Sequence, residues 1–561
     1  MVPVAVLMLV VVGCGPSPTA EERRPNVILV MTDDQGYGDI AAHGNPVVQT
    51  PNLDTLHAES VRFTDFHVDP TCSPTRAALL TGRYATKTGV WHTIAGRSQL
   101  HREETTVAEL LGEAGYATGI FGKWHLGDND PFRPQDVGFD DVLIHGGGGI
   151  GQTPDAWGND YVDDTYWHNG RREAVAGYCT TVFFDHALSF IEAHRSEPFF
   201  LYLPTNVAHA PFRAPDPYVQ AYRDAGVSDR LARFYGMITH FDEQLGRLRR
   251  RLEAWGLADN TILIFTTDNG TAGRAYNAGM KGYKGSQYEG GHRVPFYVHW
   301  PAGGWTEGRD VDTLAAHIDV LPTLLEAAHV QPPADLDLDG RSLVPLLQQT
   351  DGWPDRTLFV HSQRIQHPEK WRRSAVMTER WRLIDGEELY DIRADSAQET
   401  DVASAHPAVV SELRAAYDAW WDELADAFDR YTRIVLGREV ETTSRLTAHD
   451  WHNPESEVPW HQDQIKQDPV LNGFWAVDVV HGGTYEIVLR QRPRGVQHAL
   501  DGVEARVAIG SVDRSVPIPE GAVEVRLRVN LAAGPTRLHT GLVEADGTTR
   551  GAYYTYVKRM E

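Results

Sequence analysis

Four short apolar runs in the first half of the chain each end in polar or charged residues. Continuous apolar runs of this length are typical of strands buried on both faces of a parallel sheet. In open α/β sheets, ligands collect at the carboxyl ends of such strands. We therefore expect the polar residues after these runs to lie close together. They are Asp33 and Asp34 after Val27–Met31, Lys123 and His125 after "YATGIF", His209 after Phe199–Leu203, and Asp268 and Asn269 after Thr261–Phe265.

Stretches with helical periodicity alternate with these runs. They cover Thr106–Ala114, Asp185–His194 and Leu231–Trp255. Alternation of strands with helices predicts a mostly parallel sheet flanked by helices. The predicted fold class of this part is therefore α/β.

Two further regions follow the α/β part. "ERWRLIDGEELYDI" predicts an antiparallel strand pair that turns at Asp385-Gly386, and an apolar stripe over residues 408–428 predicts a helix packed on a core. From Phe474 onward, short strands alternate with glycine turns, which predicts an all-β sandwich or barrel-like module. We expect a large α/β domain over residues 25–345, a smaller α+β subdomain over 346–440, and a β-rich accessory module over 441–561.

The first 24 residues resemble an export signal. Val4–Val12 is an apolar run, too short to span a bilayer as a mature helix, and it resembles the central region of a secretory signal peptide. Val11-Val12-Gly13-Cys14 resembles a bacterial lipobox, whose cysteine receives lipid after cleavage. We expect an exported protein, either a periplasmic or cell-surface lipoprotein attached to a membrane through Cys14 or a secreted protein. A plain signal peptide that is cleaved off is the alternative.

Net charge and cysteine content limit the binding partners and the disulfides that the chain can have. The 561 residues carry a formal net charge of −25, which argues against nucleic acid or an anionic membrane surface as a partner. A local basic pocket for an anionic substrate remains compatible with this charge. The chain has three cysteines, and lipid on Cys14 would leave Cys72 and Cys179 as one disulfide or two free thiols.

Two of the strand ends carry pairs of oxygen ligands. Asp33 and Asp34 follow one strand, and Asp268 and Asn269 follow another. Hard divalent cations such as calcium or magnesium prefer such ligands, and no cluster of histidine and cysteine with zinc spacing accompanies them. Aspartate and asparagine are also common in caps and turns. The combination of two such pairs predicts a metal site.

Five basic residues are expected at strand ends or in loops. These residues are Arg76, Lys123, His125, His209 and Lys284. Taken singly, each is an ordinary surface charge or core histidine. Together with a metal ion they would form a pocket for a multiply charged oxyanion.

Cys72 stands at the expected start of a helix, in "DPTCSPTRAALLTGRY". A helix N-terminus lowers the pKa of a thiol, so a thiolate nucleophile is the simplest interpretation. However, thiolates are poor ligands for hard cations. The neighbouring oxygen ligands therefore predict that the reactive atom at this position is oxygen.

The run Cys72-Ser73-Pro74-Thr75-Arg76, continued by Thr81-Gly82-Arg83, resembles the Cys-x-Pro-x-Arg…Thr-Gly-Arg element of type I sulfatases, in the alkaline phosphatase superfamily. "FGKWHLG", "TTDNG", "YEGGHRVP" and "ELYDI" follow in the order of that family, so the resemblance covers roughly residues 25 to 405. It implies that a formylglycine-generating enzyme converts Cys72 to formylglycine (3-oxoalanine). One hydroxyl of the hydrated aldehyde then attacks sulfur, and the other later helps to expel sulfate.

The resemblance also implies a role for each candidate residue. Calcium would be bound by Asp33, Asp34, Asp268 and Asn269 together with residue 72. Arg76 and Lys123 would stabilise formylglycine, and His125 would take a proton from its hydrate. His209 and Lys284 would hold the sulfate oxygens, with His209 donating a proton to the leaving alcohol.

We therefore expect a calcium-dependent, arylsulfatase-like sulfuric ester hydrolase that acts on sulfated carbohydrates in polysaccharide degradation. His361 and Arg364, in "LFVHSQRIQHPEKW", are expected to approach the substrate. One alternative is a phosphonate or phosphate ester hydrolase of the same superfamily. Another is a secreted carbohydrate-binding protein without catalytic activity.

Overall fold

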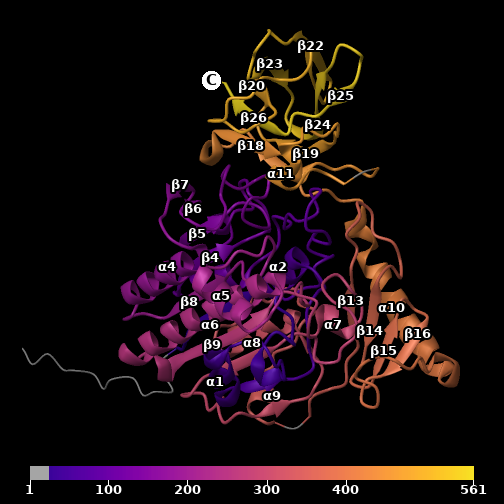
Figure 1. The fold of residues 1–561 in the computed structure, drawn as a ribbon. Coiled ribbons are helices and arrows are strands. Elements are labelled where there is room, and N and C mark those ends of the chain that lie inside the picture. The colour runs from indigo at the N-terminus through magenta and orange to yellow at the C-terminus, as the bar shows by residue number, and fades with distance from the viewer. Residues whose placement is uncertain (1–23, 351, 456, 561) are drawn as a thin grey trace, which may run out of the picture.

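The computed structural model describes residues 24–350, 352–455 and 457–560. The predicted leader with Cys14 lies outside these residues. Figure 1 shows a helix-flanked sheet formed by the N-terminal part of the chain, a small sheet beside one long helix, and a β-rich part formed by the C-terminal residues. No helix in the described ranges combines the length and apolar composition needed to span a bilayer.

A ten-stranded sheet forms the centre of the α/β part. Its middle strands are parallel, and antiparallel strands extend it toward both edges, so the sheet as a whole is mixed. From edge to edge the strands are β11 (Asp310–Val311), β2 (Val61–Phe63), β10 (Phe296–His299), β9 (Thr261–Thr267), β1 (Asn26–Thr32), β8 (Phe199–Pro204), β4 (Ala117–Lys123), β5 (Asp141–His145), β6 (Thr165–His168) and β7 (Arg171–Ala174). The predicted α/β class is confirmed.

Helices cover both faces of this sheet because side chains of the central strand β1 alternate between two cores. Val27 and Leu29 pack against one helix layer, and Ile28 and Val30 against the other. Each such buried aliphatic side chain contributes roughly 1.5–3 kcal/mol of transfer free energy. The first layer holds α2 (Cys72–Thr81), α3 (Val107–Glu113), α8 (Val320–Ala327) and α9 (Val344–Leu347); the second holds α1 (Pro51–Glu59), α4 (Cys179–Ala193), α5 (Asp216–Asp224) and α6 (Asp229–Ala254).

The four predicted strands are confirmed, and the prediction for one helix is too short. Helix α4 begins at Cys179, six residues before the predicted Asp185. A tertiary contact fixes this start, because the backbone N–H of Cys179 donates to the carbonyl of Tyr161 at 2.9 Å. Arg76, expected at a strand end or in a loop, lies instead on helix α2.

A four-stranded antiparallel sheet follows, covered by the long helix α10 (Pro407–Phe428). The predicted turn joins its last two strands, and Asp385 and Gly386 have φ values of 51° and 72°, as a tight hairpin turn requires. Leu413, Trp420 and Leu424 on α10 are buried against this sheet, as the apolar stripe predicts. The strands are β13 (Leu358–His361), β14 (Ser374–Met377), β15 (Trp381–Ile384) and β16 (Glu388–Asp391).

The C-terminal residues form a sandwich of two sheets around a separate core. Ile94 and Ala95 of the α/β part join this core, and Ala95 donates a backbone hydrogen bond of 2.8 Å to His449. The sandwich therefore packs directly on the α/β part. One sheet holds β17 (Ile434–Leu436), β19 (Phe474–Val479), β24 (Gly534–Val543), β21 (Glu504–Ile509), β22 (Val512–Pro517) and β25 (Thr549–Arg550). The other holds β18 (Thr443–Thr447), β26 (Tyr554–Arg559), β20 (Gly483–Arg490) and β23 (Val525–Leu531).

Candidate active site

The parallel register of β1 and β9 places the four predicted oxygen ligands side by side. Thr32 pairs with Thr267, so both strands end at the same level of the sheet. The polar residues that follow each strand therefore lie next to one another. The backbone N–H of Asp34 donates to Asp268 Oδ1 at 3.1 Å, and Asn269 Nδ2 donates to Asp34 Oδ1 at 2.9 Å. These side chains form one group although they are more than 230 residues apart in sequence.

Helix α2 brings Cys72 to this group. The helix begins at Cys72, and the thiol lies 3.6 Å from Asp33 Oδ1. The potential ligand atoms of Asp33, Asp34, Cys72 and Asp268 all lie within 4.8 Å of one another. Cys72 and Cys179 are both free, which excludes the disulfide between them.

The donor set fits a hard divalent cation. Three carboxylates and one amide converge in a site whose side chains are almost fully buried. The amide oxygen of Asn269 is buried and accepts no hydrogen bond from the described residues. A buried, unpartnered oxygen beside three carboxylates is what a calcium-like ion would satisfy.

Three cationic side chains surround the carboxylates. Lys123 Nζ lies 2.7 Å from Asp33 Oδ2, and Arg76 Nη2 lies 2.7 Å from Asp268 Oδ2. Lys284 Nζ donates to Asp34 and lies 3.4 Å from the sulfur of Cys72. These three cations formally cancel the three carboxylates. A bound dication would therefore leave the site with a charge of +2, which suits an anionic ester.

Exposure shows the side from which a substrate enters. The side chains of Lys123, Arg76 and Asp268 are fully buried, whereas those of Lys284 and His209 are 22% and 15% exposed. Lys284 and His209 therefore form the solvent-facing rim.

The two predicted histidines are held in fixed orientations. His125 Nε2 bonds the carbonyl of Thr93 at 2.8 Å, and its Nδ1 is buried without a hydrogen-bond partner among the described residues. His209 Nε2 lies 4.0 Å from Asp34 Oδ2. Burial lowers the pKa of His209 to about 3 and that of His125 well below its ordinary value. Both imidazoles are therefore neutral at neutral pH.

The environment of Cys72 does not support a thiolate. Burial raises the pKa of the thiol to about 12, and the nearby negative charge of Asp268 adds to the shift. Burial and Asp268 also raise the pKa of Asp33 to about 7. Burial of the thiol, together with the charge of Asp268, therefore outweighs the expected effect of the helix N-terminus on its pKa.

The structure brings together all ten predicted site residues and adds a glycine loop that the sequence analysis missed. Gly146–Gly149 follow β5, and a Cβ at Gly148 would lie 2.1 Å from the ring of His125. A Cβ at Gly149 would lie 3.4 Å from the ring of His209. The run "HGGGG" was the available signal, because only glycine at position 148 lets this loop approach the ring of His125 so closely.

The C-terminal module also reaches the site, which nothing in its sequence indicates. The ring of His449 lies 6.2 Å from the ring of His125, centroid to centroid. Of the two residues expected to approach the substrate, His361 is buried with Nε2 2.6 Å from the hydroxyl of Thr86, whereas Arg364 is exposed.

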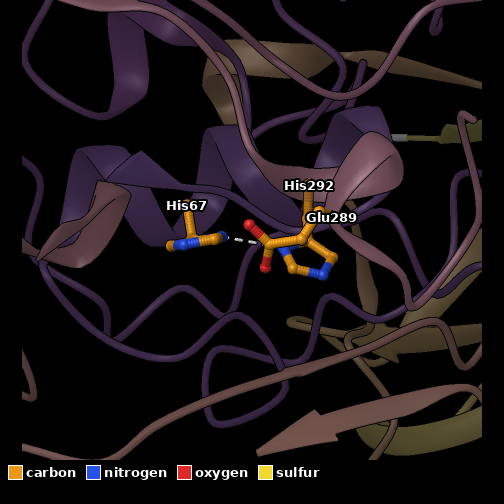
Figure 2. Close-up of side chains that lie close together, drawn as sticks. All are labelled: His67, Glu289 and His292. Carbon is orange, nitrogen blue, oxygen red and sulfur yellow. Dashed lines mark hydrogen bonds between the residues drawn. The ribbon is translucent and has the colours of Figure 1, made fainter. Parts of the chain in front are cut away.

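A second cluster of potential metal ligands lies outside the site. Figure 2 shows His67 from β3 (Phe66–His67) and Glu289 and His292 from α7 (Glu289–His292), with their side chains pointing toward one another. All three are buried, and their potential ligand atoms lie within 4.8 Å of one another.

The ring nitrogens and the carboxylate of this cluster all form hydrogen bonds within the protein. His67 Nδ1 bonds His292 Nδ1 at 2.9 Å, and the remaining ring nitrogens bond Asp65 Oδ1 at 2.9 Å and a backbone carbonyl at 3.0 Å. Arg382 bonds both Glu289 and Asp65 at 2.7 Å. Burial opposes ionisation of Glu289, but the charge of Arg382 lowers its pKa to about 2. The arrangement is a satisfied polar network and not a metal centre.

The chain matches known sulfatases over most of the α/β part. A family model described as sulfatase matches residues 25–330, and a model described as "N-sulphoglucosamine sulphohydrolase, C-terminal" matches residues 283–417. Human N-acetylgalactosamine-6-sulfatase is 33% identical over 374 residues, which is 62% of this chain and 70% of that protein. Human arylsulfatase A is 35% identical over 371 residues, which is 61% of this chain and 71% of that protein.

The chain is also similar to a solved structure. The crystal structure of Ps i-CgsB in complex with k-i-k-neocarrahexaose superposes with a TM-score of 0.65 at 28% identity, covering 71% of this chain and 93% of that one. The matched regions contain all ten predicted site residues. The chain therefore belongs to the sulfatase family, within the alkaline phosphatase superfamily, and is a sulfuric ester hydrolase.

Proposed function

We propose that the chain is a calcium-dependent sulfatase that uses formylglycine formed from Cys72 to cleave sulfate esters of carbohydrates. The observation that carries this proposal is the position of Cys72. Its side chain lies 3.6 Å from a carboxylate of the metal group and 3.4 Å from Lys284 on the exposed rim. A nucleophile at this point would touch both the metal and the sulfate group.

Formylglycine accounts for the mismatch between Cys72 and its surroundings. A thiol with a pKa of about 12 is a poor nucleophile at neutral pH, and thiolates are poor ligands for calcium. When formed, formylglycine supplies a hydrated aldehyde whose hydroxyl oxygens suit both tasks. Maturation would require a formylglycine-generating enzyme as a partner.

We assign Asp33, Asp34, Asp268 and Asn269 as the calcium ligands supplied by the strand ends. Calcium would offset charge on the sulfate oxygens and favour the deprotonated form of a bound hydroxyl. The unpartnered Asn269 Oδ1 supports this assignment. Arg76 and Lys123 pair with Asp268 and Asp33, and would hold these carboxylates in place for the ion.

The rim residues would act on the substrate. We assign Lys284 and His209 to the sulfate oxygens because they are the partly exposed cationic and imidazole groups of the site. His209 would protonate the leaving alcohol, since an anionic sulfate beside the ring favours imidazolium. His125 would accept a proton at its unpartnered Nδ1 when the group at position 72 is regenerated.

The names of the relatives support a carbohydrate substrate. One relative is named for a sulfated N-acetylgalactosamine, and one matching structure holds a neocarrahexaose. We extend this substrate class to the present chain, as part of polysaccharide degradation. We also propose export through residues 1–24, with lipid on Cys14, and a domain division at residues 345 and 440, although β17 (Ile434–Leu436) already pairs with β19 of the sandwich.

Parallel assays with an aryl sulfate, an aryl phosphate and an aryl phosphonate test the proposed function. Protein from a host that has the formylglycine-generating enzyme is expected to favour the sulfate, with turnover that requires calcium. A preference for the phosphonate, or sulfate turnover that is unaffected by coexpression of that enzyme, would contradict the proposal. A panel of sulfated oligosaccharides then identifies the natural substrate.

A further inference from the structure

We propose that a cleft beside the active site binds a second anionic group of the substrate, a carboxylate or sulfate on a neighbouring sugar. This inference rests on the proposed carbohydrate sulfatase function. The cleft has a volume of about 550 Å³. Three parts of the chain line it: residues 92–95 of the α/β part, the loop between β13 and β14, and a segment of the C-terminal module before β19.

The loop between β13 and β14 makes one wall strongly basic. Arg364, Arg372 and Arg373 all line the cleft. Within the described residues, neither Arg364 nor Arg373 forms an ion pair, and Arg372 only approaches the exposed Glu369 at 3.9 Å. Burial lowers the pKa of Arg372, and the positive charge of Arg373 lowers it further. A chain with a net charge of −25 thus concentrates unpaired positive charge at this wall.

The basic wall is continuous with the active site. Arg373 Nη1 lies 3.5 Å from the carbonyl of Gly285, which follows the rim residue Lys284. A second connection runs through Thr93. Its backbone N–H donates to His92, which lines the cleft, at 2.7 Å, and its carbonyl bonds His125 of the active site. A substrate whose sulfate lies at Lys284 can therefore extend directly into the cleft.

The C-terminal module supplies another wall of the cleft. Glu455 and Glu457 line it, together with Asn453 and Pro454. Arginine binds carboxylate and sulfate through paired N–H donors, whereas carboxylates accept hydrogen bonds from sugar hydroxyls. A cleft with both kinds of wall suits an anionic sugar and not a simple inorganic ion. The module would therefore complete the binding site in addition to packing on the α/β part.

Competitive inhibition of aryl sulfate hydrolysis tests this proposal without knowledge of the natural substrate. The probes are inorganic sulfate, a chondroitin 6-sulfate tetrasaccharide that carries uronate carboxylates, and a carrageenan tetrasaccharide that carries only sulfates. For the wild-type protein, at least one tetrasaccharide is expected to inhibit more tightly than inorganic sulfate. Tighter inhibition by the chondroitin 6-sulfate tetrasaccharide identifies the second group as a carboxylate. Tighter inhibition by the carrageenan tetrasaccharide identifies it as a sulfate.

Arginine removal gives the decisive comparison. Arg364→Ala and Arg372→Ala should each raise the ratio of the tetrasaccharide inhibition constant to that of inorganic sulfate by about tenfold, which corresponds to about 1.4 kcal/mol for the loss of a charge-assisted hydrogen bond. Arg372 also bonds the carbonyl of Ser362 at 2.6 Å, so its loss affects the loop. Arg364 forms no such bond within the described residues, and its variant keeps the test valid if Arg372→Ala misfolds.

Lys370→Ala is the matched control. Lys370 lies on the same loop and carries the same charge, but it pairs with Asp418 at 2.8 Å and does not line the cleft. The proposal is wrong if Lys370→Ala changes the ratio as much as Arg364→Ala. It is also wrong if no tetrasaccharide inhibits more tightly than inorganic sulfate. A wild-type protein that fails to cleave any sulfate ester would instead count against the proposed function.

Discussion

The surroundings of Cys72 show how neighbouring residues change the chemistry expected of a side chain. A cysteine at the first position of a helix is normally acidified. Here burial and Asp268 raise its pKa to about 12. The free energy of forming a thiolate is therefore unfavourable at neutral pH, and the same carboxylates that disfavour it fit a metal ion.

Substitution of Cys72 tests this point. Cys72→Ala is expected to remain folded and to lose steady-state aryl sulfate turnover by at least about 10³-fold, as removal of a nucleophile does. Cys72→Ser should release at most one equivalent of product and then stop, because a serine ester of sulfate cannot collapse to an aldehyde. Steady-state and burst kinetics with an aryl sulfate measure both results.

Cys179→Ala is the control for these variants, since Cys179 is also buried and free but lies on α4, outside the site. It should keep its turnover. Sustained wild-type turnover by Cys72→Ser would contradict the formylglycine mechanism.

A buried histidine remote from the site gives a pH prediction. His240 is 4% exposed, and burial lowers its pKa to about 4. Its ordinary pKa in the unfolded chain is about 6.5, so protons bind the unfolded state first as the pH falls. The stability contributed by neutral His240 is thus lost between about pH 6.5 and pH 4, by roughly 2 kcal/mol at pH 5.

His240→Gln should therefore lose about 2 kcal/mol less stability than the wild type between about pH 7.5 and pH 5. Urea unfolding at the two pH values measures the difference. His481→Gln, at an exposed position, controls for loss of an imidazole. An identical pH dependence in wild type and His240→Gln would disprove the assignment.

At the scale of elements, β3, α7 and β15 are joined through the buried network around Arg382. The guanidinium bonds Asp65 and Glu289, which lie beside β3 and on α7. Because Cys72 and Lys284 lie in segments next to these elements, the network holds the two sides of the active site together.

Arg382→Met should destabilise the protein by about 3–5 kcal/mol, since it leaves two buried carboxylates without their cation. Arg393→Met is the matched control, because the ion pair of Arg393 with Glu379 is largely exposed and should contribute less than about 1 kcal/mol. Urea unfolding followed by tryptophan fluorescence compares the two variants. Equal losses of stability would contradict the importance of the network.

The sequence predicts those parts of the site that depend on local pattern. Asp33 and Asn269 follow runs whose apolar character indicates buried strands, and parallel pairing brings their ends together. The start of α4 at Cys179 depends on a contact with Tyr161 that has no local signal. The approach of His449 to the site depends on how the C-terminal module packs on the α/β part.

At the scale of the whole molecule, the active site lies where the α/β part, the small sheet and the C-terminal module meet. The site proper comes from the α/β part, whereas the adjoining cleft has walls from all three. On the proposals above, the α/β part would bind the sulfate ester, and the cleft would bind a neighbouring anionic group of the sugar.

Chelation tests whether a bound metal supports both the activity and the stability of the protein. Three buried carboxylates repel one another, and a bound dication would offset that repulsion. Removal of the metal with a chelator should lower both aryl sulfate turnover and the thermal unfolding midpoint, and calcium should restore both. The calcium assignment would be contradicted if neither the turnover nor the unfolding midpoint responds to the chelator and elemental analysis finds no metal.

The mass of the tryptic peptide Phe63–Arg76 tests the central claim most directly. The protein should be produced in a host that contains the formylglycine-generating enzyme, and again in a host that lacks it. We expect the mass of an aldehyde at position 72 in the first protein and of a cysteine in the second, with aryl sulfate turnover in the first alone. An unmodified cysteine in a fully active protein would contradict it.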